Sequence, residues 1–276
     1  MWTRKTFQEM FRPPAVGMIH LLPLPGSPGW SGGMDAVVEA ALADAAALAE
    51  AGFSAVMIEN YHDIPFFPER VPPETVAALT RCVGAVRREF PGLLTGVNVL
   101  RNDAVAALGI AASTGAEFLR VNVHTGAAAT DQGPLTGRAW ETLRKRRELG
   151  VPVGILADVR VKHARPLVER PLAEEARDLR LRGLADGVIV TGVATGAAAD
   201  PALLRDVREA LPDCPLLVGS GVEPGTARFL LDVADGCIVG SSLQRPDPAG
   251  RRAVAPDLAA AFIVAVTSSN PEGPET

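Results

Sequence analysis

Polar side chains that could move protons stand where apolar, strand-like runs of this sequence end. Glu59 follows the run AVMI, His20 follows VGMI, and Asp158 follows GILA. A buried carboxylate is costly without a partner, so Glu59 should meet a cation, a metal or a substrate. Carboxylates and a neutral imidazole can serve as general acids or bases near neutral pH. We predict these three residues as catalytic groups, with a core histidine satisfied by the backbone as the alternative for His20.

The most charged strand end is the segment ADVRVKHA, residues 157–164. Because side chains alternate between the two faces of a strand, Asp158, Arg160 and Lys162 should share one face if the strand persists that far. Lys162 then has two open roles, contact with a phosphate or carboxylate, and action as an amine nucleophile whose pKa is lowered by burial. We predict Lys162 as a fourth catalytic group. A solvated loop start with one surface ion pair is the alternative.

Two glycine–serine turns end the last two strand-like runs, in VGSGV (218–222) and IVGSS (238–242). Glycine lets backbone N–H groups approach a ligand closely, and such donors near a helix start suit an anion. Tight turns that need glycine for a positive φ are the alternative. The predicted phosphate-binding residues are Gly219, Ser220, Gly221, Gly240, Ser241 and Ser242.

Other polar residues at strand ends and in the following loops are predicted to contact the substrate. They are Asn98, Asn122, His124, Asp131, Arg160 and Thr191. An amide both donates and accepts hydrogen bonds, so the asparagines suit hydroxyl and carbonyl groups. Asn102 and Asp103 precede an apolar run, where such residues more commonly cap a helix. We assign capping to one of these two.

The same rim residues could also bind a divalent cation, with Glu59 and Asp158 as its oxygen ligands beside His20 and asparagine side chains. No spacing in the chain fits a zinc signature. We therefore predict no dedicated metal site and no cofactor, and leave open Mg²⁺ that arrives with a phosphorylated substrate.

The elements that would position these residues alternate between apolar strand-like runs and helix-like segments. Helical spacing of apolar residues marks the ranges 35–51, 73–88, 103–114, 172–182, 201–211, 224–232 and 255–266. Eight runs rich in Val, Ile and Leu predict strands buried on both faces, as in a parallel sheet covered by helices. We predict an α/β fold, a single parallel eight-stranded (β/α)8 TIM barrel, whose strand ends share one rim. A doubly wound open sheet is the main rival, but its dinucleotide-binding glycine fingerprint is missing.

Length and composition fit one barrel. The chain has 276 residues, so we predict a single domain over 1–276, with a core at about 15–266 and flexible tails at 1–12 and 268–276. A net charge of −5 with no basic face argues against nucleic acid. Three scattered cysteines favour a reducing, cytoplasmic location. We find no signal peptide and no apolar run of the roughly 18 residues that a membrane span needs. Homo-oligomers are common among barrels, so self-association is left open.

Several motifs together resemble one known family. They are GMIHLLPLPGSPG, ENYHDIPF, GVNVLRNDAVAALGIAASTGAEFLRVNV, TDQG, ILADVRVKHARPL and VGSGV. In this order, from about Val16 to Phe262, they are similar to the BtpA/SgcQ family, whose members resemble ribulose-phosphate-binding barrels. The sequence departs from the family pattern at Arg160, where a histidine is usual, and at His62. One branch of the family is linked to photosystem I accumulation, and the other accompanies genes of sugar uptake and metabolism.

These observations lead us to expect an enzyme, a lyase, isomerase or hydrolase, that acts on a small phosphorylated sugar or nucleoside-like compound. The mixed ring of polar residues opposite a phosphate site supports it, because such a ring costs folding energy unless ligand binding or mutual pairing offsets that cost. A non-catalytic biogenesis or stability factor for a membrane complex is the alternative that the photosystem branch implies. A ligand-sensing barrel without catalysis is a third.

Overall fold

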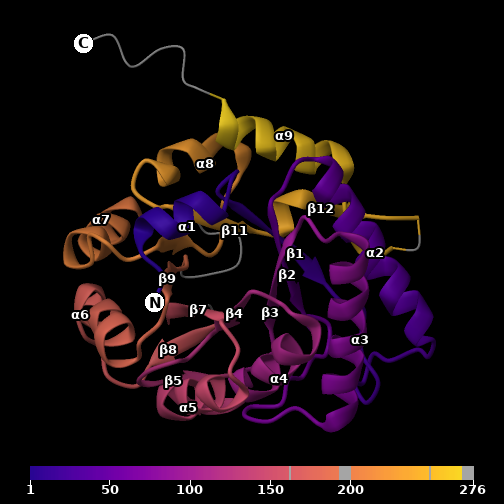
Figure 1. Cartoon of the computed structure of the whole chain (residues 1–276), viewed down its shortest axis with the longest axis horizontal. Helices are drawn as coiled ribbons and strands as arrows, with labels where there is room; N and C mark the ends of the chain where they lie inside the picture. Colours follow the sequence, from indigo (N-terminus) through magenta and orange to yellow (C-terminus); the bar gives the residue numbers. More distant parts are fainter. Residues whose placement is uncertain (162, 193–199, 249, 269–276) are drawn as a thin grey trace.

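Eight parallel strands close into a barrel in the computed structural model, which describes residues 1–161, 163–192, 200–248 and 250–268 (Figure 1). In chain order the barrel strands are β1 (Ala15–His20), β2 (Ala55–Glu59), β3 (Leu94–Asn98), β4 (Phe118–Val121), β7 (Gly154–Arg160), β9 (Gly187–Val190), β10 (Leu216–Val218) and β11 (Gly236–Val239). The parallel pairing of β1 with β11 closes the ring. The predicted (β/α)8 barrel is confirmed, and the open sheet is excluded.

Helices surround the strands, as Figure 1 shows. They are α2 (Met34–Glu50), α3 (Pro73–Glu89), α4 (Ala104–Thr114), α5 (Ala139–Leu149), α6 (Leu172–Arg177) with a following π-helical turn (Asp178–Arg182), α7 (Pro201–Ala210), α8 (Pro224–Leu231) and α9 (Pro256–Thr267). The sequence patterns did not predict α5, because most of its residues are charged or polar and only Thr142 is buried. Within the described ranges, no helix combines the length and apolar character needed to cross a bilayer.

Apolar side chains fill two layers of the molecule. The larger layer lies between the outer faces of the strands and the helices. The smaller one fills the inside of the barrel and includes Met57 and Phe118. Burial on both faces explains why the strands are nearly continuous in Val, Ile and Leu.

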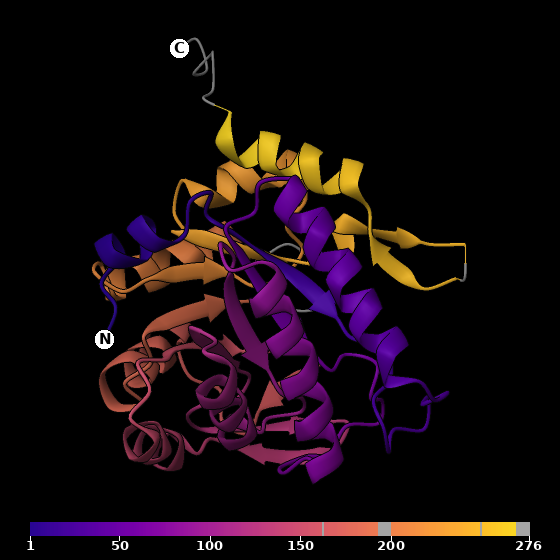
Figure 2. The ribbon, with the colours of Figure 1, turned by 45° about the vertical axis from the view of Figure 1, so that its right-hand side comes forward.

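The N-terminal segment differs from the predicted flexible tail. Residues Arg4–Met10 form helix α1, and Thr3 caps it in a capping box with Thr6. Phe7 and Phe11 are fully buried and stack with ring centroids 4.2 Å apart. Helix α1 lies at the end of the barrel where the strands begin (Figure 2). The spacing of four residues between Phe7 and Phe11 places both on one helix face. This spacing indicates a packed helix, and the prediction of a flexible tail did not take it into account. Of the predicted C-terminal tail, only Ser268 lies within the described residues.

Loops at the opposite end of the barrel form two small sheets, which the sequence patterns did not predict. Strands β5 (Ala127–Thr130), β6 (Gly133–Thr136) and β8 (Ala164–Pro166) form one antiparallel sheet. Strands β12 (Gln244–Pro246) and β13 (Arg252–Val254) form a hairpin, which projects in Figure 2 on the side toward which the strand arrowheads point. These strands of three or four residues are too short for a clear periodicity.

Candidate functional site

A layer of polar side chains lies directly above the apolar filling of the barrel. On four strands an apolar interior residue is followed two positions later by a polar one, in the pairs Met18 and His20, Met57 and Glu59, Phe118 and Arg120, and Leu156 and Asp158. Residues two apart in a strand share a face, so these polar side chains stay on the inner side of the barrel. They lie at the carboxyl ends of the strands, where barrel enzymes carry their active sites.

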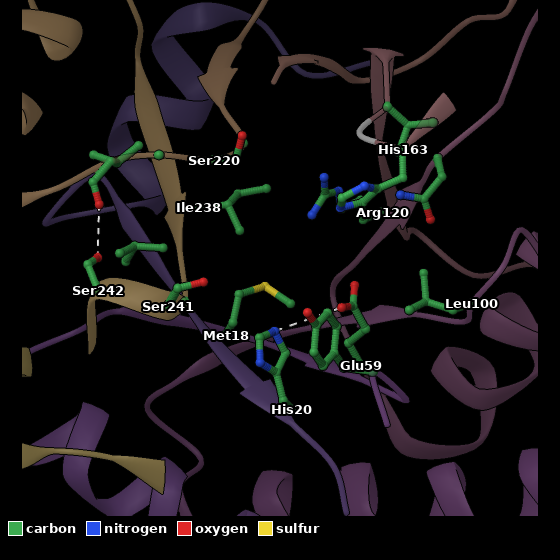
Figure 3. A pocket seen from close by; sticks show the side chains of 18 of the residues that line it. Met18, His20, Glu59, Leu100, Arg120, His163, Ser220, Ile238, Ser241 and Ser242 are labelled. Carbon is green, nitrogen blue, oxygen red and sulfur yellow. Dashed lines mark hydrogen bonds and ion pairs between the residues drawn. The ribbon is translucent and has the colours of Figure 1, made fainter. Parts of the chain in front are cut away.

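A cavity of about 300 Å³ opens above this layer. Ten residues predicted for the site line it: His20, Glu59, Asn122, Asp131, Gly219, Ser220, Gly221, Gly240, Ser241 and Ser242. Figure 3 shows His20 and Glu59 between the serines on one side and Leu100 on the other. The cavity therefore combines the predicted acid–base residues with the predicted phosphate-binding turns.

His20 and Glu59 face each other at the ends of neighbouring strands β1 and β2. Their Nε2 and Oε1 atoms are 3.9 Å apart. The other carboxylate oxygen of Glu59 accepts a hydrogen bond of 2.5 Å from the Asn98 amide. His20 Nδ1 lies 3.1 Å from Nε2 of Gln244, and its ring stacks on Tyr61. If the Gln244 amide donates to Nδ1, the imidazole proton sits on Nε2 and points toward Glu59.

Arg120 and Asp158 form a buried, bidentate ion pair inside the barrel. Nε and Nη2 of Arg120 each donate to one carboxylate oxygen over 2.9 Å. Burial alone would lower the pKa of Arg120, but the charge and hydrogen bonds of Asp158, together with the charge of Glu59, raise it above its ordinary value. Arg120 lines the cavity and Asp158 does not, so this ion pair of zero net charge presents its guanidinium rather than its carboxylate to a ligand.

Asn122 contacts the same ion pair from strand β4's end. Its Nδ2 donates to Oδ2 of Asp158 over 3.2 Å. Its Oδ1 is buried and has no hydrogen-bond partner among the described residues. Asn122 thus holds the Asp158 carboxylate and also lines the cavity, so its contact with a substrate stays a prediction.

The expected common face of Asp158, Arg160 and Lys162 is not what the described part of β7 shows. The pairing with β9 shifts register between Asp158 and Arg160, so a bulge inserts one extra residue there. Arg160 therefore turns away from the cavity and pairs with Glu175 on α6 at 2.8 Å. The hydrogen bond to Glu175 is the main reason that the pKa of Arg160 is raised. Lys162 lies outside the described residues.

The two glycine–serine turns line the cavity and contain backbone donors without a partner among the described residues. Gly221 has φ +66, and a Cβ on Gly219 would meet Ile189 and Thr191 at about 2.5 Å, so both positions require glycine. The hydroxyls of the turns are used internally, since Ser220 accepts from the N–H of Gly192 and Ser242 donates to the carbonyl of Val222. No acceptor among the described residues meets the backbone N–H groups of Ser220, Gly221, Ser241 and Ser242.

Three further predicted substrate contacts, besides Arg160, do not line the cavity. Asn98 is buried under Glu59, and Thr191 donates to the backbone carbonyl of Arg160. His124 is buried against α6's π-helical turn, with its Nε2 at 2.9 Å from the carbonyl of Gly183, and burial lowers its pKa. These three side chains hold the structure around the site.

A model of the BtpA family matches residues 12–267. The chain belongs to the BtpA family. It is 45% identical over 262 residues, 95% of this chain and 90% of the relative, to the photosystem I biogenesis protein BtpA of Synechocystis sp.. It is 34% identical over 233 residues, 83% of this chain and 85% of the relative, to the putative sgc region protein SgcQ of Escherichia coli. An uncharacterized protein of Thermococcus kodakarensis is 47% identical over 235 residues, covering 85% of this chain and 88% of its own length.

Solved structures similar to this BtpA-family chain are barrel proteins of low sequence identity. One titled "Native KDPGal structure" has a TM-score of 0.57 at 18% identity and covers 91% of this chain and 93% of its own. The N-(5'-phosphoribosyl)anthranilate isomerase of Pyrococcus furiosus has a TM-score of 0.54 at 13% identity and covers 91% of this chain and 97% of its own. At such identities the likeness establishes the fold alone.

Sequence reasoning missed several residues of this BtpA-family site. Arg120 interrupts the buried run FLRV, and an arginine inside an apolar strand is a signal for a buried partner that could have identified it. Arg101 and His163 also line the cavity. Gln244 gave no signal, because only the β12–β13 hairpin brings it to His20.

Proposed function

We propose that this chain is an enzyme that acts by acid–base chemistry on a small phosphorylated sugar or nucleoside-like compound at the carboxyl-end rim of its barrel. One observation carries the proposal: a single cavity holds the His20–Glu59 pair, the charge of Arg120 and the two glycine–serine turns. Barrel enzymes commonly bind phosphate at the loops after their last two strands. Here those loops follow β10 and β11.

The phosphate is held by backbone donors of the two turns. The N–H groups of Ser220, Gly221, Ser241 and Ser242 have no acceptor in the described part of the chain. A dianionic group accepts several such hydrogen bonds at once. Its charge also favours a site with Arg120 in the cavity wall.

Glu59 serves as the base in this proposal. Asn98 holds one carboxylate oxygen, which leaves the other directed toward His20 and the cavity. Proton transfer next to a carbonyl builds negative charge on the carbonyl oxygen, and the fixed guanidinium of Arg120 stabilises it. Isomerisation, epimerisation and retro-aldol cleavage all use this step, and hydrolysis or phosphorolysis of a glycosidic bond suits the same groups.

No cofactor is part of the proposal. Within the described ranges, no three or more His, Cys, Asp or Glu side chains gather closely enough to hold a metal ion. Mg²⁺ is proposed only as an ion that accompanies the substrate phosphate. Self-association and a cytoplasmic location stay predictions.

A second candidate function rests on the name of one relative. The protein of Synechocystis sp. that is 45% identical is named for photosystem I biogenesis. A non-catalytic assembly or stability factor of that kind would bind a ligand or a partner without turning it over. Turnover therefore separates the two proposals.

The test incubates the protein with a panel of sugar phosphates and nucleosides and measures both thermal stabilisation and turnover. We expect Glu59→Gln to lower kcat by roughly 10² to 10⁴, the usual contribution of a general base, with a melting temperature close to that of the wild type. Asp257→Asn makes the same change at an exposed carboxylate of α9 and should keep full activity. Turnover that survives Glu59→Gln would contradict the assigned base. A panel in which no phosphorylated compound raises the melting temperature would contradict the phosphate site, because a ligand that binds only the folded state must stabilise it.

A further inference from the structure

An apolar wall forms part of the cavity lining. It consists of Tyr61, Ile64 and Phe66 in the loop after β2, and Leu100 after β3. Tyr61 is 39% exposed although its ring stacks on that of His20, and Ile64 is 57% exposed. Figure 3 places Leu100 on the opposite side of His20 and Glu59 from Ser220, Ser241 and Ser242.

Buried polar side chains brace the loop that carries this wall. Asn60 Oδ1 accepts from the N–H of Leu100 over 2.8 Å, and its Nδ2 donates to Asp63 over 3.1 Å. Asp63 Oδ1 accepts from the N–H of Leu24, also over 2.8 Å. The loop is therefore joined to the loops that follow β1 and β3. Its apolar side chains are held in place at the mouth of the cavity.

The order of groups along the cavity sets the order of groups in a ligand. With a phosphate on the turns and the reacting atoms beside Glu59, the far end of the ligand lies toward Leu100. Ile64 lines the same cavity. A sugar hydroxyl would find no hydrogen-bonding side chain on these two residues. An apolar group loses water-exposed area there, and a flat ring can pack against Tyr61, whose own ring already stacks on His20 at 4.3 Å.

We propose that this wall is a subsite for an aromatic ring that the substrate carries at the end remote from its phosphate. The substrate class is then a phosphorylated pentose with a planar ring attached, of which nucleoside monophosphates are the simplest representatives. This inference rests on the proposed function and narrows it. The wall gives affinity for the ring, while the turns give affinity for the phosphate.

Calorimetric titration with ribose 5-phosphate, AMP and UMP tests the subsite. We expect at least one of the two nucleotides to bind about fivefold or more tightly than ribose 5-phosphate, because stacking of a base commonly contributes that much. Ile64→Ser should remove most of this gain and leave ribose 5-phosphate binding unchanged. Val264→Ser is the matched control, since Val264 is 62% exposed on α9 and should change neither affinity.

Three other outcomes of this titration would contradict either the aromatic subsite or the proposed function. If ribose 5-phosphate binds and neither nucleotide binds more tightly, the aromatic subsite is wrong while the phosphate site stands. If a nucleotide gain persists in both Ile64→Ser and Phe66→Ala, the ring lies elsewhere and the subsite is again wrong. If none of the three compounds binds, the proposed function fails, and the subsite fails with it.

Discussion

The two ends of the barrel use the same kinds of charged residue for different purposes. At the end where the strands begin, Glu117, Asp186 and Asp235 directly precede β4, β9 and β11. Each accepts a hydrogen bond from the first residues of the neighbouring strand, at the N–H of Thr95, Ile155 and Leu216 respectively. Each also pairs with an arginine near the end of the helix that precedes that neighbouring strand: Arg87 of α3, Arg146 of α5 and Arg208 of α7, in turn. Helix α1 then covers this end.

At the other end, the charged groups surround a cavity. His20, Glu59 and Arg120 line it together with the two turns, whose backbone donors have no acceptor among the described residues. A polar layer arranged in this way gains stability when a ligand supplies the missing partners. The comparison indicates that the first end holds the barrel together and the second end carries the function, as is general for this fold.

The largest effect that separates the two ends is expected at Asp235. Its buried carboxylate accepts from Leu216 and pairs with both Arg208 and Arg4 at 2.6 Å. Asp235→Ala leaves Arg208 and the Leu216 N–H without this partner, so the free energy of unfolding should fall by about 3 to 5 kcal/mol. Chemical denaturation measures this change, and catalytic rates below the melting temperature should stay near those of the wild type. Asp232→Ala, at an exposed position close by, is the control. A loss of under about 1 kcal/mol would remove the contrast between the ends.

At Gln244 we expect a smaller effect, on catalysis rather than on stability. Its amide lies 3.1 Å from His20 Nδ1, and the hairpin that carries it is fixed by two hydrogen bonds from Arg251 to Asp44. Gln244→Ala removes the group that sets the imidazole tautomer, so kcat/KM should fall roughly tenfold, as expected for one lost hydrogen bond.

The companion variant Gln244→Glu distinguishes positioning from mere packing. A carboxylate accepts from Nδ1–H, which favours the opposite tautomer and the imidazolium, so the pH profile of kcat/KM should move. Unchanged profiles in both variants would show that Gln244 has only a structural role.

Apolar patterning made the barrel predictable from sequence. Burial on both faces produces strand runs that stand out against the helices, and Asp103, confirmed as the cap of α4, marks a helix start that the sequence also shows. The two small sheets were not predicted because their strands are short. Helix α1 was not predicted because its single apolar face was interpreted as part of a tail. The prediction that Arg160 shares a face with Asp158 was wrong because of the bulge in β7. One inserted residue moves every later side chain to the opposite face of the strand.

Part of the site was within reach of sequence reasoning, and part was not. Glu59, His20 and the glycine–serine turns end apolar runs, and the structure brings them to one cavity. Arg120 needed the pairing of β4 with β7, which places it beside Asp158. Ion pairs between strands depend on which strands become neighbours. Hydrophobic periodicity predicts the strands but not their order in the sheet.

Hydrogen–deuterium exchange with and without ribose 5-phosphate tests the central claim most directly, because it locates the ligand at one end of the barrel. The account predicts slower exchange of the amides in 219–222 and 240–243 when the ligand is present, since donors without an acceptor acquire one. Amides around Asp186 and Asp235 should not change, because their carboxylate partners are already in place. Protection at the α1 end, or none at the two turns while the ligand is bound, would contradict it.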